Sequence, residues 1–328
     1  MIFTSRNKFL LLTILLSIYF IIFSILITVI PLYAEIVGIF LSVLSLYISG
    51  DVFIDEARTL GRRNGFSSKS VGVYLISLGA VVDEFAVIIS ASAKGYGGIS
   101  FGTIQGSNII TLVSFLVILP FVFAGSYRKF AKDGLVLLIS TFVLLGLTVI
   151  YTIVPWYVGF LLILVFLMYL YVGKSERIPM EMEAEKIEYS SISLIASLVL
   201  LILASQAIVE YTHGLSGQFH ISPFISGFVI TGIVGSLPEI IMFSLSILKR
   251  DMDATIGIVT GSTIYKGTII LGISMFFGVI ELGVGLNSIY LMILLSLIFL
   301  LFTVIKVRKY SSIIPLVAVL IFGIFIGI

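Results

Sequence analysis

The segment QGSNIIT, residues 105–111, recurs 155 residues further along the chain as TGSTIYK, residues 260–266. At the same offset Glu84 falls on Glu239, and both glutamates lie within long apolar runs. Scattered identities would mean little in a chain rich in isoleucine and leucine. A glycine–serine pair and an intramembrane glutamate that share one offset indicate an internal repeat.

The composition places the chain among polytopic membrane proteins. Of its 328 residues 59% are hydrophobic and 11% are charged, and the mean hydropathy is +1.25, which excludes a soluble globular domain. A bilayer-crossing helix needs roughly 20 mostly apolar residues. The sequence therefore predicts an all-α fold with about 11 transmembrane helices, at about residues 9–31, 34–60, 70–94, 99–124, 134–153, 155–173, 190–214, 221–248, 254–279, 285–305 and 312–327.

The offset predicts that the repeat is inverted. It maps the second apolar run onto the seventh, so each copy contains five spans, and an odd number of spans gives the copies opposite orientations in the membrane. Inverted repeats with polar residues near the midplane are typical of secondary transporters. The expected organisation is an added N-terminal helix at 1–33, a five-helix repeat at 34–173, a cytoplasmic linker at 174–189 and a second repeat at 190–328.

The positive-inside rule predicts a cytoplasmic N-terminus and an external C-terminus, in a multi-pass protein of the plasma membrane. With this orientation 17 of the 19 basic residues lie in cytoplasmic loops, Lys94 lies outside and Lys266 lies in the membrane. Such loop anchors give no support to nucleic-acid binding, and no protein partner is implied. The chain has no cysteine and no His-Glu-x-x-His motif, so we expect neither a thiolate site nor an enzyme.

Polar side chains at membrane depth form the candidate transport site. An ionisable residue at the centre of a membrane helix costs on the order of 2.5–3.5 kcal/mol and is a functional candidate by default. We expect Glu84 and Glu239 to ligate a transported cation, with hydroxyls from Ser107 and Ser262, because hard cations prefer oxygen ligands. Asp83 is a further candidate for the transport site; because it points roughly 100° away from Glu84 on a helix, it either faces the cavity or lies beside it. The alternative is a structural pair of protonated carboxyls beside small-residue packing motifs.

Lys266 is the one formal charge in the run Ala254–Val279. Its stem reaches roughly 6 Å, whereas the bilayer centre lies about 15 Å from either interface, so we expect a partner inside the bundle: Glu84, Glu239 or Asp83. Two roles stay open for Lys266. It is either a fixed cation that fills an ion position, or a group that exchanges a proton. A fixed ammonium would weaken a divalent ion by repulsion.

These motifs resemble the sodium/calcium exchanger type of the cation/Ca²⁺ antiporter superfamily, whose repeats read approximately G-T-S-L-P-E and G-N-x-x-G-S-N-x-x-[N/D]. The resemblance is carried by GSLPE at 235–239 and GSNI at 106–109, and it covers residues 34–327. It implies that Glu84 and Glu239 are the central cation ligands, assisted by the hydroxyls of Ser107, Ser236 and Ser262. It also implies that the helices at about 34–60 and 190–214 slide across the core.

The sequence departs from this family pattern at several positions. The Thr-Ser of the first repeat is Ala80-Val81 and its Pro is Asp83, the Thr of the second repeat is Gly235, and the closing residues of the two repeats are Thr111 and Lys266. The expected function is a secondary active antiporter that exchanges Ca²⁺ for Na⁺ or H⁺, without a cofactor. The alternative is a proton-coupled or monovalent-cation exchanger in which Lys266 replaces a transported cation and Ca²⁺ transport is lost.

Overall fold

The computed structural model describes residues 31–63, 81–122, 128–151, 153–172, 190–248, 252–280, 282–305 and 309–326. Over these residues the chain is helical, and its one extended pairing is an isolated bridge between Val154 and Ile280. Seven of the described helices are long and apolar enough to cross a membrane, and two shorter apolar helices accompany them. The predicted class, an all-α polytopic membrane protein, is therefore confirmed.

The predicted count of eleven spans is not confirmed. Some predicted segments lie outside the described residues. They are the first span at about 9–31, except for its last residue, the beginning of the third span, and the linker at 174–189. The described α-helices are α2 (Pro31–Arg63), α5 (Val82–Ala93), α6 (Gly97–Val122), α7 (Ala131–Ile150), α8 (Val158–Val172), α9 (Ser191–Gln218), α10 (Pro223–Ser226), α11 (Gly232–Leu248), α12 (Met252–Tyr265), α13 (Leu271–Ser274), α14 (Leu286–Val304) and α15 (Ile313–Ile326).

Two π-helical turns connect helices that would otherwise be separate. The turn η4 (Gly227–Thr231) joins α10 to α11, and the turn η5 (Lys266–Ile270) joins α12 to α13. Short 3₁₀ turns lie at η2 (Arg128–Phe130), η6 (Leu282–Gly285) and η7 (Lys309–Ser312). A π turn accommodates one extra residue in a helix and is often found at functional sites.

Three pairs of helices begin 155 residues apart. Gly97 begins α6 and Met252 begins α12; Ala131 begins α7 and Leu286 begins α14; Val158 begins α8 and Ile313 begins α15. The offset found between sequence motifs is therefore also the offset between these helix starts.

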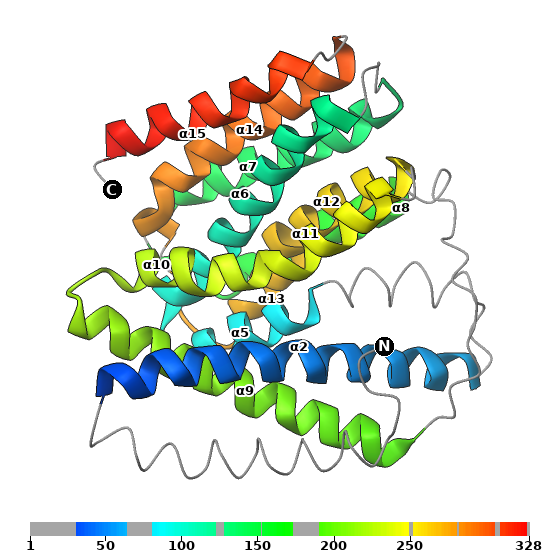
Figure 1. Ribbon diagram of the computed structural model, residues 1–328. Coiled ribbons are helices and arrows are strands. Elements are labelled where there is room, and N and C mark those ends of the chain that lie inside the picture. Colours follow the sequence, from blue (N-terminus) through cyan, green and yellow to red (C-terminus); the bar gives the residue numbers. More distant parts are fainter. Residues whose placement is uncertain are drawn as a thin grey trace.

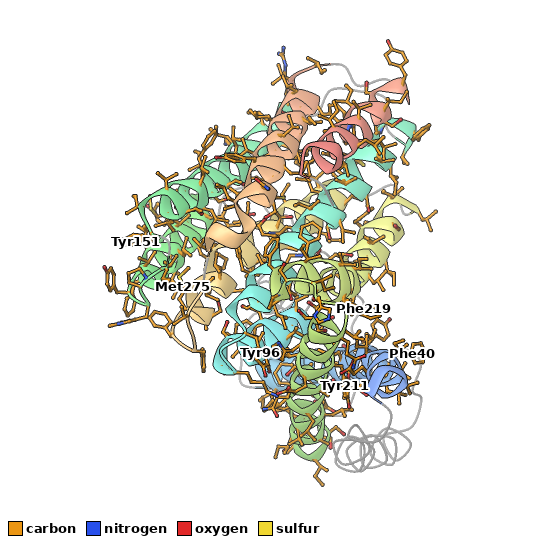
Figure 2. The ribbon with its side chains drawn as sticks, turned by 90° about the vertical axis from the view of Figure 1, so that its left-hand side faces the viewer. Phe40, Tyr96, Tyr151, Tyr211, Phe219 and Met275 are labelled. Atoms are coloured by element: carbon orange, nitrogen blue, oxygen red, sulfur yellow. The ribbon has the colours of Figure 1, made fainter. Side chains whose placement is uncertain are left out.

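The helices α2 and α9 lie together along one side of the bundle, and α14 and α15 lie on the opposite side (Figure 1). Figure 2 shows the labelled Phe40 of α2 and Tyr211 of α9 on that same side, away from Tyr151. Gly38 of α2 lies against the ring of Tyr211, where a Cβ atom would collide with it. The absence of a side chain at position 38 thus lets the two helices pack closely.

Both ends of the α2–α9 pair are linked by buried carboxylates of α2. At one end Gln218 Nε2 donates to Glu35 Oε2 at 2.7 Å. At the other end the Ser190 backbone amide, at the N-cap of α9, donates to Glu56 Oε2 at 2.8 Å. The two helices therefore run antiparallel and are bonded near both termini.

Helix α6 lies in the middle of the bundle and packs tightly against the segment α10–η4–α11. A Cβ atom at Gly102 or Gly106 would collide with backbone atoms of Phe224 or Phe228. Farther along α6, Phe115 lies edge-on to Phe243 and to Phe299, and all three rings are buried. This close approach brings the polar residues of α6 next to those of α11.

Candidate cation site

Lys266 lies at the centre of a buried cluster of polar side chains. Its side chain has no solvent-exposed surface, and its Nζ atom lies 2.9 Å from Glu239 Oε2 and 3.2 Å from Glu84 Oε2. The ammonium also donates to Ser107 Oγ at 3.1 Å. One cation of the protein itself thus bridges the two glutamates that sequence symmetry paired.

Glu239 is held by donors on two helices. Its Oε2 atom accepts the hydrogen bond from Lys266 and another from Thr111 Oγ1 at 2.6 Å. Glu239 directly follows Pro238 in α11, and the helix continues through this proline. Although proline removes one backbone donor, the neighbouring turns keep Glu239 at a fixed place in a regular helix.

Glu84 has a different environment. It lies in the first turn of α5, where the helix dipole favours a carboxylate. Although Oε2 lies 3.2 Å from the Lys266 ammonium, neither carboxylate oxygen has a hydrogen-bond partner among the described residues. A Cβ atom built on Gly235 would collide with this carboxyl group. The missing side chain at position 235 therefore provides the space that the Glu84 carboxyl occupies.

The π turn η5 begins at Lys266 itself. The matching part of α6, which contains Thr111, lies in a helix that is α-helical from Gly97 to Val122. The serines of the glycine–serine pairs also differ. Ser107 contacts the lysine, whereas Ser262 Oγ donates to Val259 O in its own helix at 3.3 Å.

Not every predicted site residue joins the cluster. Ser236 Oγ donates to Ile233 O of its own helix at 2.7 Å and Ser262 Oγ donates to Val259 O, so in the described part of the chain neither hydroxyl is hydrogen-bonded to Lys266 or to the glutamates. Asp83 is half-buried, and among the described residues it forms no ion pair with Lys266. The cluster therefore consists of Glu84, Ser107, Thr111, Glu239 and Lys266.

The cluster has the symmetry of the repeat. At the 155-residue offset Thr111 corresponds to Lys266, and Glu84 corresponds to Glu239. The contact between Thr111 and Glu239 therefore has its counterpart in the contact between Lys266 and Glu84. Asn108 Nδ2 also donates to Thr263 O at 3.5 Å, and these two residues share the same offset. Residues that correspond under a two-fold relation and also touch lie near its axis.

Gln105 and Asn108 belong to the same face of α6 but were not assigned as ligands from the sequence. Both are buried, and the side-chain oxygen of each lacks a hydrogen-bond partner among the described residues. Their place in the segment QGSNIIT was the available signal. Since α6 is buried along most of its length, the polar residues of this segment could have been expected to face protein.

The charges of the cluster set its chemistry. In their charged forms Glu84, Glu239 and Lys266 together have one net negative charge. Among the described residues no group of three or more His, Cys, Asp or Glu side chains could hold a metal ion. Two carboxylates and two hydroxyls offer oxygen ligands suited to hard cations, and the ammonium opposes a second positive charge.

A second polar contact joins α9 to the end of α5. Lys94 Nζ lies 2.6 Å from Glu210 Oε1, and the ring of Tyr96 stacks on His213 with centroids 4.0 Å apart. Burial and the negative charge of Glu210 raise the pKa of Tyr96. Tyr96 is labelled beside α9 in Figure 2. These residues lie apart from the Lys266 cluster, at the C-terminal end of α5.

Comparison with known proteins identifies relatives over nearly the whole chain. The chain is 25% identical over 269 residues to the "Putative antiporter CaxA" of Alkalimonas amylolytica, which covers 77% of this chain and 84% of that protein. The fold resembles the crystal structure of the H⁺/Ca²⁺ exchanger CAX, with a TM-score of 0.71, 16% identity, and coverage of 99% and 89% of the two chains. It also resembles the sodium-calcium exchanger NCX_Mj, with a TM-score of 0.56, 22% identity, and coverage of 88% and 97%.

The family model described as "Sodium/calcium exchanger protein" matches twice, at residues 34–173 and 189–328. Together the two matches span well over half of the chain. The chain therefore belongs to the sodium/calcium exchanger family and is a multi-pass membrane protein of the cation antiporter type.

Proposed function

We infer that the protein is a secondary active cation antiporter whose transport site is the buried cluster around Lys266. Two inverted five-helix repeats, at 34–173 and 190–328, would move relative to one another and expose Glu84 and Glu239 alternately to each side. The observation that carries the proposal is the convergence of two buried glutamates from opposite halves on a single ammonium. A buried charge cluster of this kind is costly, so a scaffold without transport activity would gain nothing from it.

The first candidate substrate pair is Ca²⁺ exchanged for Na⁺ or H⁺. It is supported by the family and by the exchangers whose folds are similar, one of which is described as an H⁺/Ca²⁺ exchanger and another as a sodium-calcium exchanger. The carboxylates and the hydroxyls of Ser107 and Thr111 are ligands that Ca²⁺ accepts. Ser236 and Ser262 would join only if their hydroxyls turned away from their own helices.

The second candidate is proton-coupled or monovalent-cation exchange, in which the Lys266 ammonium replaces one transported cation. The contacts of Nζ with both glutamates favour this candidate. At a separation of about 4 Å and an effective dielectric constant near 20, two unit charges interact by roughly 4 kcal/mol, so a divalent ion meets twice the ammonium repulsion and twice the carboxylate attraction of a monovalent ion. Since the ammonium already lies between the two glutamates, this candidate needs one transported cation fewer at the site.

Flux into proteoliposomes tests both candidates. Purified protein is reconstituted, and uptake of radiolabelled Ca²⁺ is measured with an outward Na⁺ gradient and then with a pH gradient. Uptake of radiolabelled Na⁺ is measured under the same gradients. We expect monovalent flux and little Ca²⁺ flux. Ca²⁺ uptake that matches Na⁺ uptake would favour the first candidate, and no flux of any cation would reject an antiporter.

The variant Lys266→Asp links the flux to the cluster. We expect it to strengthen divalent-cation binding, because it replaces the ammonium by a third carboxylate. Ca²⁺ affinity is measured by isothermal titration of the detergent-solubilised protein. An unchanged or weaker affinity would show that residue 266 does not face the transported cation.

The proposed orientation, with a cytoplasmic N-terminus in the plasma membrane, can be tested with introduced cysteines, since the chain has none. Gly283→Cys lies in a predicted external loop, where the space around the residue is open among the described atoms. Lys132→Cys lies near a predicted cytoplasmic loop. An impermeant maleimide added to intact cells should label the first variant, and it should label the second only after the membrane is permeabilised.

A further inference from the structure

We propose that the two symmetry-related glutamates have different roles: Glu84 alone binds the transported cation, which is monovalent, and Glu239 forms a permanent ion pair with Lys266. This inference rests on the proposed antiporter function. It assigns the charge-carrying ligand of that site to one residue. It also makes Gly235 a positioning residue, because its missing side chain admits the Glu84 carboxyl.

The hydrogen bonds of Glu239 already satisfy one of its carboxylate oxygens. Lys266 Nζ donates to Glu239 Oε2 at 2.9 Å and Thr111 Oγ1 donates to the same atom at 2.6 Å. Charge-assisted bonds of this length are about twice as strong as neutral ones. Its other oxygen, Oε1, has no hydrogen-bond partner among the described residues. A cation that bound Oε2 would compete with both donors, and it would leave a buried ammonium without its closest partner.

Glu84 lacks comparable donors. Its nearest charged contact is Lys266 Nζ at 3.2 Å, and neither of its oxygens accepts a hydrogen bond from a described residue. The carboxyl group is 1% exposed. Glu84 thus has an ion pair but no donor as close as those of Glu239 Oε2, which leaves its carboxylate the more open of the two to a ligand from outside the protein.

The charge balance defines the class of that ligand. Lys266 and Glu239 neutralise one another, so Glu84 provides one negative charge for the transported ion. A monovalent cation makes the loaded cluster neutral, whereas Ca²⁺ would leave a net positive charge in the membrane interior next to the ammonium. Asp83, the adjacent carboxylate, is half-buried and forms no ion pair with Lys266 among the described residues, so this balance is drawn for the three charged groups that are in contact.

The packing around Gly235 explains how the fold accommodates the Glu84 carboxyl. A Cβ at this position would collide with Oε1, Cγ and Cδ of Glu84. In α11, Gly235 lies one helical turn before Glu239, so a single helix holds one glutamate in its own sequence and makes room for the other. Among the described residues, no glycine makes space for the Glu239 carboxyl in this way.

Two double variants with equal net charge test the inference. Glu239→Gln/Lys266→Met removes the proposed permanent pair and keeps Glu84, whereas Glu84→Gln/Lys266→Met keeps Glu239 instead. Each retains one carboxylate in the cluster. We expect Na⁺ flux in proteoliposomes to be at least about tenfold higher in the first double variant than in the second.

Ion-dependent thermal stability provides the second measurement. Na⁺, K⁺ and Li⁺ are added separately to the detergent-solubilised proteins, and the midpoint of unfolding is recorded at constant ionic strength. A monovalent cation should raise the midpoint for the unmodified protein and for Glu239→Gln/Lys266→Met, but not for Glu84→Gln/Lys266→Met. If the first double variant does not fold, Glu239→Met/Lys266→Met replaces it, since apolar replacement of a buried pair is often tolerated.

Each outcome decides a separate question. Equal flux in the two double variants, or greater flux in Glu84→Gln/Lys266→Met, would overturn the assignment of Glu84 while leaving the antiporter function intact. A folded but inactive Glu239→Gln/Lys266→Met would also overturn it, because the pair would then be needed for transport. Failure of the unmodified protein to move any cation would instead reject the proposed function.

Discussion

Helix α6 and the segment α12–η5–α13 correspond at the 155-residue offset, yet they differ at the site. They begin 155 residues apart, and each contains a glycine–serine pair followed four residues later by a polar side chain. In α6 that side chain is Thr111, in a continuous α-helix. In the second segment it is Lys266, and a π turn begins there.

The two side chains make corresponding contacts with different consequences. Thr111 donates one hydrogen bond to Glu239, whereas Lys266 contacts Glu84 and also reaches Glu239 and Ser107. A threonine adds no charge, but the lysine cancels one of the two carboxylates. The 155-residue offset thus relates the positions of the helices, and one residue that differs between the two segments, Lys266, sets the charge of the cluster.

The largest effect should come from removing the lysine alone. Lys266→Met leaves two buried carboxylates close together without a counter-ion, and we expect it to cost about 3–5 kcal/mol of folding free energy. Thermal unfolding in detergent, without added multivalent cations, measures the loss. Lys94→Met is the control, because it removes a partly exposed ion pair worth roughly 0–1 kcal/mol. Similar stability losses in the two variants would show that Lys266 contributes no more to the folding free energy than a partly exposed ion pair does.

Making the second repeat like the first should convert the site into one for divalent cations. Lys266→Thr copies the residue found at the matching position of α6 and restores two uncompensated carboxylates. We expect Ca²⁺ affinity to rise roughly a hundredfold, because an ammonium within hydrogen-bond distance of the carboxylates no longer repels the ion. Isothermal titration with Ca²⁺ checks this, and Mg²⁺ titration reports selectivity. No gain in Ca²⁺ affinity would contradict the idea that one residue sets the charge of the site.

Removing the hydroxyl of the first repeat should have a smaller effect. Thr111→Val deletes the hydrogen bond to Glu239 at nearly constant volume, and bonds to charged groups contribute about 1.5–3 kcal/mol. Thr111→Ser keeps the donor and is the matched control. Thermal unfolding of the two variants separates the hydroxyl from the methyl group. If serine and valine destabilise equally, the bond to Glu239 contributes nothing.

The smallest effect should follow from filling the space beside Glu84. Gly235→Ala introduces a Cβ that collides with the carboxyl group, and we expect monovalent-cation binding to weaken about tenfold as the side chain shifts. Gly146→Ala, in α7, is the control, because no described atom lies within 4 Å of a Cβ there. Cation-dependent shifts in the unfolding midpoint report binding for both variants. Equal shifts in the two variants would show that Gly235 does not affect cation binding.

The convergence of the site could be predicted from the sequence because it depends on helix positions. Glu84, Glu239 and Lys266 each lie in an apolar run, and the repeat offset relates Glu84 to Glu239 and Lys266 to Thr111. Because a buried charge needs a partner, contacts among the three charged residues follow from general rules. The hydroxyls could not be predicted in the same way. Ser262 matches Ser107 at the repeat offset and Ser236 lies three residues before Glu239, but serine in a helix can turn its hydroxyl back to a carbonyl of the preceding turn.

The π turn and the role of Gly235 also lay beyond the sequence. A π turn requires only one additional residue within a helix, and the segment KGTII has no composition that distinguishes it from an α-helical turn. The sequence alone indicates only that Gly235 stands where the family pattern has a threonine ligand. Its actual contribution, space for the Glu84 carboxyl, depends on how α5 and α11 pack and could only be seen in three dimensions.

The bonds at the two ends of the α2–α9 pair have a consequence for membrane thickness. Glu35 and Glu56 are separated by 21 residues, which in an α-helix corresponds to about 31 Å, close to the roughly 30 Å of a bilayer's hydrocarbon core. The spacing of the two bonds therefore matches the thickness of the hydrocarbon core. A pair of helices fastened at both ends acts as a strut of fixed length, so a thinner or thicker bilayer would have to tilt it as a whole.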